Sequence, residues 1–160
     1  MSGEATFAAG CFWQVEIVFG NTPGVLSTEV GYTGGHAERP SYEQVCGGTT
    51  GHAEAVHLTF DPEQVSYDEL LEVFFNLHDP TQLNRQGPDI GHQYRSAVFF
   101  HSPEQERAAI AAKERAATAY KRPAVTEVVP AERFWPAEDY HQRYLEKRGL
   151  ATCRVPSAAA

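Results

Sequence analysis

The segment Gly10-Cys11-Phe12-Trp13 constrains the fold most, because it separates two stretches of different hydrophobic periodicity. Ala5–Ala9 is apolar enough for a short buried strand, whereas Gln14–Phe19 has a spacing compatible with a helix. Gly10 allows the tight turn that such a junction needs. The sequence therefore predicts a strand that passes directly into a helix, with Cys11 in the first helical turn.

The predicted position of Cys11 favours the ionised form of its thiol. The first N–H groups of a helix lack intrahelical partners, and the helix macrodipole is positive at that end. Such surroundings can lower the pKa of a cysteine from ~8.5 into the range of ~3.5 to ~7.5. Cys11 is therefore a candidate nucleophile, although the residue types alone fit a buried structural cysteine equally well.

Length and charge limit the fold and the partners. A chain of 160 residues fits one domain with a sizeable core. Its net charge of −8, with Lys and Arg spread thinly, argues against binding to nucleic acid. No apolar run approaches the ~20 residues of a membrane-spanning helix, and the first residues do not resemble a signal peptide. We expect a monomeric, cytoplasmic protein without a membrane partner.

The three cysteines, Cys11, Cys46 and Cys153, lie far apart in the sequence. An odd number of widely spaced cysteines in a reducing compartment does not indicate structural disulfides. The chain has no Cys-x-x-Cys pair, and its seven histidines do not complete a zinc-binding pattern. The pattern predicts no metal site and is compatible with a catalytic dithiol plus one further cysteine.

Apolar periodicity and turn residues place the remaining elements. Further strands are predicted at Val25–Tyr32, Ala53–Phe60, Ser96–His101 and Thr126–Val129. Further helices are predicted after the Ser66–Glu69 capping box, at Pro103–Tyr120 and at Pro136–Lys147, and a long polar loop at Thr81–Tyr94. This order predicts an α+β fold, a two-layer sandwich in which helices pack on a mixed β-sheet. We expect a single domain over residues 1–160 with a mobile C-terminal tail over residues 149–160.

Gly10-Cys11-Phe12-Trp13 is followed by further distinctive segments at residues 31–35, 40–46, 50–56, 76–80 and 93–96. In this order they resemble the motifs of the peptide-methionine (S)-S-oxide reductases, the A-type methionine sulfoxide reductases. The resemblance covers nearly the whole chain, from about Phe7 to Cys153. It implies reduction of methionine-(S)-sulfoxide, free or in proteins, to methionine. It also implies no prosthetic cofactor, and thioredoxin or another dithiol as the external reductant.

Two roles in this chemistry follow from the resemblance. It makes Cys11 the nucleophile that attacks the sulfoxide sulfur and Glu54 the acid that protonates its oxygen. Glu54 lies at the entrance of a predicted strand, where a solvated glutamate is the common case. Beside a thiolate in an aromatic-lined pocket, however, like charge and desolvation both favour the neutral carboxyl. We expect Glu54 to be protonated near pH 7 before the reaction.

The same resemblance assigns further residues to the substrate pocket. Tyr42 and Tyr94 match phenols that hydrogen-bond the sulfoxide oxygen, and Asp89 matches an acidic residue that helps hold the site. Phe12 and Trp13 are expected to form the apolar wall that receives the S-methyl group. On residue types alone, both tyrosines fit ordinary core packing as well.

Recycling is implied to use Cys153. Attack converts Cys11 to a sulfenic acid, with which a second thiol can condense to form a disulfide. Cys153 follows Gly149 in the predicted tail and matches the first recycling cysteine of the family. The tail lacks the Gly-Tyr-Cys context and the second, distal cysteine of some relatives. Cys46 matches a non-catalytic cysteine in many relatives and is interpreted as structural.

Two other functions stay open on the residues alone. Cys11 and His52 could form an acyl-transfer dyad, since a thiolate at a helix start suits that chemistry too. A binding module could instead use the pocket beside Phe12 and Trp13 to recognise oxidised methionine without reducing it. Replacing Cys153 with Ser would spare hydrolysis but stop thioredoxin-linked turnover, which separates the first alternative from a reductase.

Overall fold

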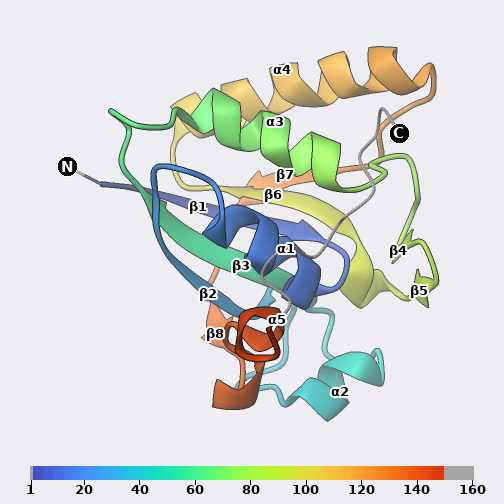
Figure 1. The fold of residues 1–160 in the computed structure, drawn as a ribbon. Helices are drawn as coiled ribbons and strands as arrows, with labels where there is room; N and C mark the ends of the chain where they lie inside the picture. Colours follow the sequence, from blue (N-terminus) through green and yellow to red (C-terminus); the bar gives the residue numbers. More distant parts are fainter. Residues whose placement is uncertain (1, 150–160) are drawn as a thin grey trace.

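The computed structural model describes residues 2–149. The main strands are β1 Gly3–Ala9, β2 Val25–Thr33, β3 Ala53–Phe60, β6 Ser96–Phe100, β7 Glu127–Pro130 and β8 Trp135–Pro136. They form one sheet in the order β7-β6-β1-β3-β2-β8 (Figure 1). Neighbouring strands are antiparallel except β6 and β7, which are parallel. The sheet is therefore mixed, as predicted.

Helices cover one face of this sheet. The described α-helices are α1 Phe12–Gly20, α2 Tyr42–Cys46, α3 Tyr67–Leu77, α4 Pro103–Tyr120 and α5 Tyr144–Lys147. Figure 1 shows α1, α3 and α4 together on one side of the strands. Phe7 of β1 stacks there on Phe19 of α1 and Phe74 of α3, with ring centroids 5.1 and 5.2 Å apart. Burial of such side chains, worth ~1.5–3 kcal/mol each, joins the two layers. The predicted single α+β domain is confirmed.

Serine capping boxes determine where two of the helices begin. At α3, the hydroxyl of Ser66 accepts from the N–H of Glu69, and the Glu69 side chain accepts from the N–H of Ser66, which is the predicted capping box. Ser41 and Gln44 form the same reciprocal pair at α2. No helix is predicted from the sequence at residues 42–46, although Ser-x-x-Gln is a recognisable helix start.

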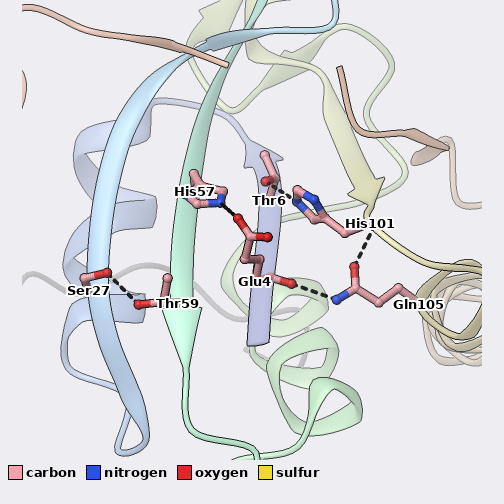
Figure 2. A network of polar contacts seen from close by, with 7 residues as sticks. All are labelled: Glu4, Thr6, Ser27, His57, Thr59, His101 and Gln105. Atoms are coloured by element: carbon pink, nitrogen blue, oxygen red, sulfur yellow. Dashed lines mark hydrogen bonds and ion pairs between the residues drawn. The ribbon is translucent and has the colours of Figure 1, made fainter. Parts of the chain in front are cut away.

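The other face of the sheet carries a network of polar side chains (Figure 2). Nε2 of His57 lies 3.0 Å from a carboxylate oxygen of Glu4, and the hydroxyl of Thr6 lies 2.9 Å from Nε2 of His101. The side chain of Gln105 donates to the carbonyl oxygen of Glu4 at 2.7 Å. The network ties β1 to β3 and to the start of α4. Because side chains alternate along a strand, the residues between these point toward the helices.

The predicted long loop at Thr81–Tyr94 has structure of its own. It contains a short hairpin of β4 (Arg85–Gln86) and β5 (Asp89–Ile90), followed by the 3-10 helix η1 (His92–Tyr94). Gly91, at φ 144°, separates the two. Local turns thus place residues from this segment at a fixed position beside β1 and α1.

The predicted helix at Pro136–Lys147 is wrong. Residues 137–149, here called the C-terminal strap, contain the 3-10 helix η2 (Asp139–His141) and the short α5.

Within the described residues no helix combines the length and apolar character needed to cross a membrane. The predicted tail lies outside the described residues from residue 150 onward, and Cys153 lies there with it.

Tertiary contacts explain why the C-terminal strap is not one helix. The side chain of Gln142 pairs with β2 as a strand would: Oε1 accepts from the N–H of Val30 and Nε2 donates to its carbonyl oxygen, both at 2.9 Å. Arg143 then adopts a left-handed backbone with φ 52°. Residues with a Cβ atom do not adopt this conformation inside a right-handed helix.

Candidate active site

The junction between β1 and α1 sets the position of Cys11. Gly10 has φ +95°, and a Cβ atom there would lie 2.9 Å from Cβ of Gln86. Both its backbone and its neighbour therefore require glycine. Cys11 is the N-cap of α1, with φ −59° and ψ 121°, and its carbonyl oxygen accepts from the N–H of Gln14 at 3.2 Å. The predicted position in the first helical turn is wrong by one residue.

The surroundings of the Cys11 thiol favour its neutral form. Burial raises the pKa of this thiol to about 12, and the negative charges of Glu54 and Asp89 act in the same direction. The backbone N–H groups of Trp13 and Gln14 lower the pKa, as expected at a helix start, but they are outweighed. The prediction of a thiolate is therefore wrong for the substrate-free protein.

Glu54 is the buried acid of the site. It lies in β3 opposite Tyr32 of β2, and 1% of its surface is exposed. Oε1 accepts from the backbone N–H of Phe12 at 3.2 Å, which fixes the carboxyl at the start of α1. Oε2 has no hydrogen-bond partner among the described residues. Burial raises the pKa of Glu54 to about 8, so most of the carboxyl is protonated at pH 7, as predicted.

Tyr42 and Tyr94 reach the site from separate elements, the first residue of α2 and the last residue of η1. The side chain of Gln93 in η1 donates to the backbone carbonyl oxygen of Cys46 in α2 at 3.3 Å. Burial raises the pKa of both phenols, and the neighbouring Cys46 and Glu54 raise them further. The phenols are therefore hydrogen-bond donors at neutral pH. The structural interpretation of Cys46 omits the contact with Gln93, because it depends on the turn that brings η1 against α2.

Asp89 lies in β5 and completes the set of polar groups around Cys11. Its negative charge raises the pKa values of Cys11, Glu54 and Tyr94. These effects require all four groups to lie within electrostatic reach of one another. The β4–β5 hairpin thus carries the predicted acidic residue to the end of β1.

The predicted apolar wall is built around a histidine that the sequence analysis missed. Trp13 donates its indole N–H to Nδ1 of His141 at 2.9 Å, and the His141 side chain is fully buried. The His141 ring lies 4.3 Å from the ring of Tyr42 and 5.2 Å from that of Phe12, between centroids. The available signal was a histidine enclosed by aromatic residues at 140–144. The wall therefore includes part of the C-terminal strap.

Glu138 is a second residue that the sequence analysis missed. Its Oε1 accepts from the hydroxyl of Tyr32 at 2.8 Å, and its Oε2 accepts from the backbone N–H of Tyr42 at 3.0 Å. These bonds lower the pKa of Glu138 and keep it ionised. Since Tyr42 is the first residue of α2, Glu138 also satisfies a free N–H at the helix start. It fixes the position from which the Tyr42 phenol enters the site.

His52 is not available as the base of a thiol hydrolase. Its ring is buried, Nδ1 accepts from the backbone N–H of Gly35 at 3.0 Å, and Nε2 lies 2.7 Å from the carbonyl oxygen of Ala37. Both nitrogens are thus used to hold the loop after β2. The dyad with Cys11 that the residue types left open has no support in this geometry.

The arrangement brings a thiol, a neutral carboxyl and two phenols together beside an apolar wall. Among residues 2–149, no three His, Cys, Asp or Glu side chains are placed to hold a metal ion. A nucleophile next to a proton donor suits attack on a polar double bond whose oxygen must be protonated. Phenols can hydrogen-bond that oxygen while the wall receives an apolar group.

Comparison with known proteins identifies the family. A family profile described as Peptide methionine sulfoxide reductase matches residues 3–160. The peptide methionine sulfoxide reductase MsrA of Geobacter sulfurreducens is 62% identical over 153 residues, covering 94% of this chain and 94% of that protein. Mxr1 from Saccharomyces cerevisiae in reduced form matches with a TM-score of 0.87 and 35% identity, over 92% of this chain and 86% of that chain.

A further solved structure agrees with these matches. Methionine sulfoxide reductase A of Corynebacterium diphtheriae matches with a TM-score of 0.85 and 38% identity, over 95% of this chain and 77% of that chain. Sequence and fold thus agree over nearly the whole length, and the residues gathered around Cys11 are those on which the resemblance rests. The chain belongs to the peptide methionine sulfoxide reductase family.

Proposed function

We propose that this protein reduces methionine-(S)-sulfoxide, free or in proteins, to methionine through the thiol of Cys11. The observation that carries the proposal is the carboxyl of Glu54, which is buried and protonated at neutral pH and leaves one oxygen without a partner in the described residues. A simple binding module would have no use for such a proton donor next to a thiol.

The first step reduces the sulfoxide and oxidises Cys11 to a sulfenic acid. The Cys11 sulfur attacks the sulfoxide sulfur, while Glu54 transfers its proton to the sulfoxide oxygen. The carboxylate formed in this way can accept the proton of the Cys11 thiol, so a thiol of high pKa still reacts. Glu54 then passes this proton to the hydroxyl on the substrate sulfur, the S–O bond breaks and water leaves, so an S–S bond joins Cys11 to the substrate. A water molecule attacks the Cys11 sulfur, the S–S bond breaks and methionine leaves. Cys11 is left as a sulfenic acid, and the proton released from the water returns to Glu54.

Substrate orientation comes from the remaining site residues. The phenols of Tyr42 and Tyr94 donate hydrogen bonds to the sulfoxide oxygen. Phe12 and Trp13 receive the S-methyl group. Because the methyl wall and the oxygen donors occupy different sides of the sulfur, only one epimer places its sulfur within reach of Cys11 while its methyl group and its oxygen are both bound. We assign this preference to the S epimer.

The second step regenerates the thiol. Cys153 condenses with the Cys11 sulfenic acid, which forms a disulfide and releases water. A dithiol protein of the thioredoxin type then takes over the disulfide by exchange and leaves both thiols reduced. Mxr1 from Saccharomyces cerevisiae has been solved in complex with Trx2. The cycle requires no prosthetic cofactor, and its need for an external dithiol fits a reducing, cytoplasmic setting.

The test is a single-turnover reaction of fully reduced protein with excess methionine-(S)-sulfoxide and no reductant. We expect one methionine per protein and a Cys11–Cys153 disulfide in the peptide map, and no methionine from the R epimer. Cys153→Ser should still form one methionine and leave Cys11 as a sulfenic acid that dimedone traps. Absence of methionine with the wild-type protein would reject the proposed function.

A further inference from the structure

Glu16 is a buried carboxyl that the proposed reaction does not use. It lies in α1, and 3% of its surface is exposed. Its Oε1 accepts from the backbone N–H of Arg143 at 2.7 Å, and its Oε2 accepts from the hydroxyl of Thr28 at 2.9 Å. A buried carboxylate is tolerated where such bonds satisfy it. Glu16 therefore joins three elements, namely α1, β2 and the C-terminal strap.

The backbone at Arg143, which Glu16 binds, is in a conformation that local interactions do not stabilise. Arg143 is the N-cap of α5 in the left-handed conformation, with φ 52° and ψ 41°, and its side chain makes no cap hydrogen bond. This conformation is disfavoured for residues with a Cβ atom. The α5 helix has only 4 residues, too few to be stable without tertiary contacts. The direction in which α5 leaves Arg143 thus depends on the bond to Glu16.

The first residue of α5 packs on the predicted substrate wall. The Tyr144 ring stacks on the indole of Trp13, with centroids 3.8 Å apart and planes 8° from parallel. The edge of the same indole donates to His141. The C-terminal strap therefore fixes Trp13 at its face and at its edge. Tyr144, which holds the face, directly follows the residue that Glu16 binds.

We propose that Glu16 is a positioning residue that sets the orientation of Trp13 through Arg143 and Tyr144. The proposal rests on the proposed function where it takes Trp13 as the wall for the S-methyl group. A cavity of about 150 Å³ lies beside these residues and is lined by Trp13, Glu16, Thr28 and Arg143 among others. It gives the indole space to tilt once Tyr144 is no longer held against it.

The direct test is the fluorescence of Trp13. The chain has two tryptophans, so Trp135→Phe leaves Trp13 as the single emitter. In this background, Glu16→Ala should shift the emission to longer wavelength and increase quenching by acrylamide, because the indole leaves its stack. Glu16→Gln should emit as the parent does, since its amide oxygen still accepts from Arg143 and its NH₂ can donate to Thr28.

A double substitution separates positioning from general loosening. Tyr144→Ala should give the same emission shift as Glu16→Ala, and the combined variant should add nothing further, because both act on one stack. Glu146→Gln is the matched control: it removes a carboxylate that lines the same cavity but does not bind Arg143. Its emission should equal that of the parent. Additive shifts, or an equal shift with Glu146→Gln, would overturn the proposal.

Kinetics with methionine-(S)-sulfoxide give the functional readout. Glu16→Ala should raise KM about tenfold, the lower end of what one methyl-sized contact is worth, with a smaller fall in kcat. Glu16→Gln should restore the parent KM. If Glu16→Ala does not fold, Thr28→Val removes one of the two bonds to Glu16 and should shift the emission less, in the same direction.

The outcomes distinguish this proposal from the proposed function. Unchanged Trp13 emission in a folded Glu16→Ala or Thr28→Val protein rejects the positioning role, whatever the activity. If the wild-type protein forms no methionine, the proposed function fails, while the emission of the variants still decides whether Glu16 positions Trp13.

Discussion

Glu54 and Glu16 are both buried, with 1% and 3% of their surfaces exposed. The carboxyl of Glu54 lies at the start of α1, and Glu16 is a residue of α1. Burial raises the pKa of both. They differ in their partners. Glu16 accepts a hydrogen bond at each oxygen, from Arg143 and Thr28. Glu54 is held at one oxygen by Phe12 and leaves the other without a partner in the described part of the chain.

This difference fits the two proposed roles, in which Glu16 positions a wall residue and Glu54 donates a proton. A buried polar atom without a partner costs ~1–3 kcal/mol, and next to a nucleophile such an atom can bind a substrate. The free oxygen of Glu54 meets this condition beside Cys11. Glu16 has no open position for a substrate, and its two bonds give it a fixed geometry instead.

The largest effect is expected from Glu54→Gln. The amide can still accept from the N–H of Phe12, but it holds no proton that it can transfer at neutral pH. The rate of methionine formation in a single turnover should fall by about 10²- to 10⁴-fold. Rapid-quench assays without reductant measure it, and alkylation of Cys11 and circular dichroism serve as controls for the fold. Full activity would show that another group supplies the proton.

The next largest effect is expected from removing the two phenols, which tests whether they bind the sulfoxide oxygen that Glu54 protonates. Tyr42→Phe combined with Tyr94→Phe should lower kcat about 10²- to 10³-fold, as loss of hydrogen-bond donors to a developing charge does elsewhere. Tyr67→Phe is the matched control, because the hydroxyl of Tyr67 is buried in the core and has no partner among the described residues. An equal loss with Tyr67→Phe would assign the effect to packing.

The pH dependence tests whether Glu54 reacts in its neutral form. With a pKa of about 8 for Glu54 and about 12 for Cys11, both groups hold their protons at pH 7. If the reaction needs both protons, its single-turnover rate should be level below pH 8 and fall about tenfold per unit above it. Glu54→Gln should abolish this fall. A rate that rises about tenfold per unit up to pH 8 and is level between pH 8 and 12 would show that the pair reacts with one proton, as thiolate and acid.

Sequence patterns predicted those parts of the molecule that depend on neighbouring residues. The Ser66–Glu69 capping box and the turn at Gly10 need only local geometry, and they are found as predicted. The strands whose apolar residues alternate are also found, with ends that differ by at most two residues. The family motifs name Cys11 and Glu54, which the fold brings together at the start of α1.

The predictions that were wrong concern features that depend on contacts between distant residues. The C-terminal strap follows the helical pattern of its sequence only in part, because Gln142 pairs with Val30, 112 positions away, and Arg143 with Glu16, 127 positions away. The pKa of Cys11 likewise depends on burial by the whole site and on Glu54, which a helix-start argument does not include. The N–H groups at the helix start lower the pKa of Cys11, as predicted, but desolvation raises it by more.

The smallest expected effect is on the free energy of unfolding, which should differ between substitutions at Glu16 and at Glu54. Glu16→Ala leaves the N–H of Arg143 and the hydroxyl of Thr28 without their acceptor, so the free energy of unfolding should fall by ~1–2 kcal/mol. Glu54→Gln removes no partner from the protein and should change it by less than ~0.5 kcal/mol. Urea denaturation at pH 7 measures both, with Glu16→Gln as the conservative control. If Glu54→Gln were the more destabilising change, the Glu54 carboxyl would be a structural group, and its free oxygen would not mark the working acid of the site.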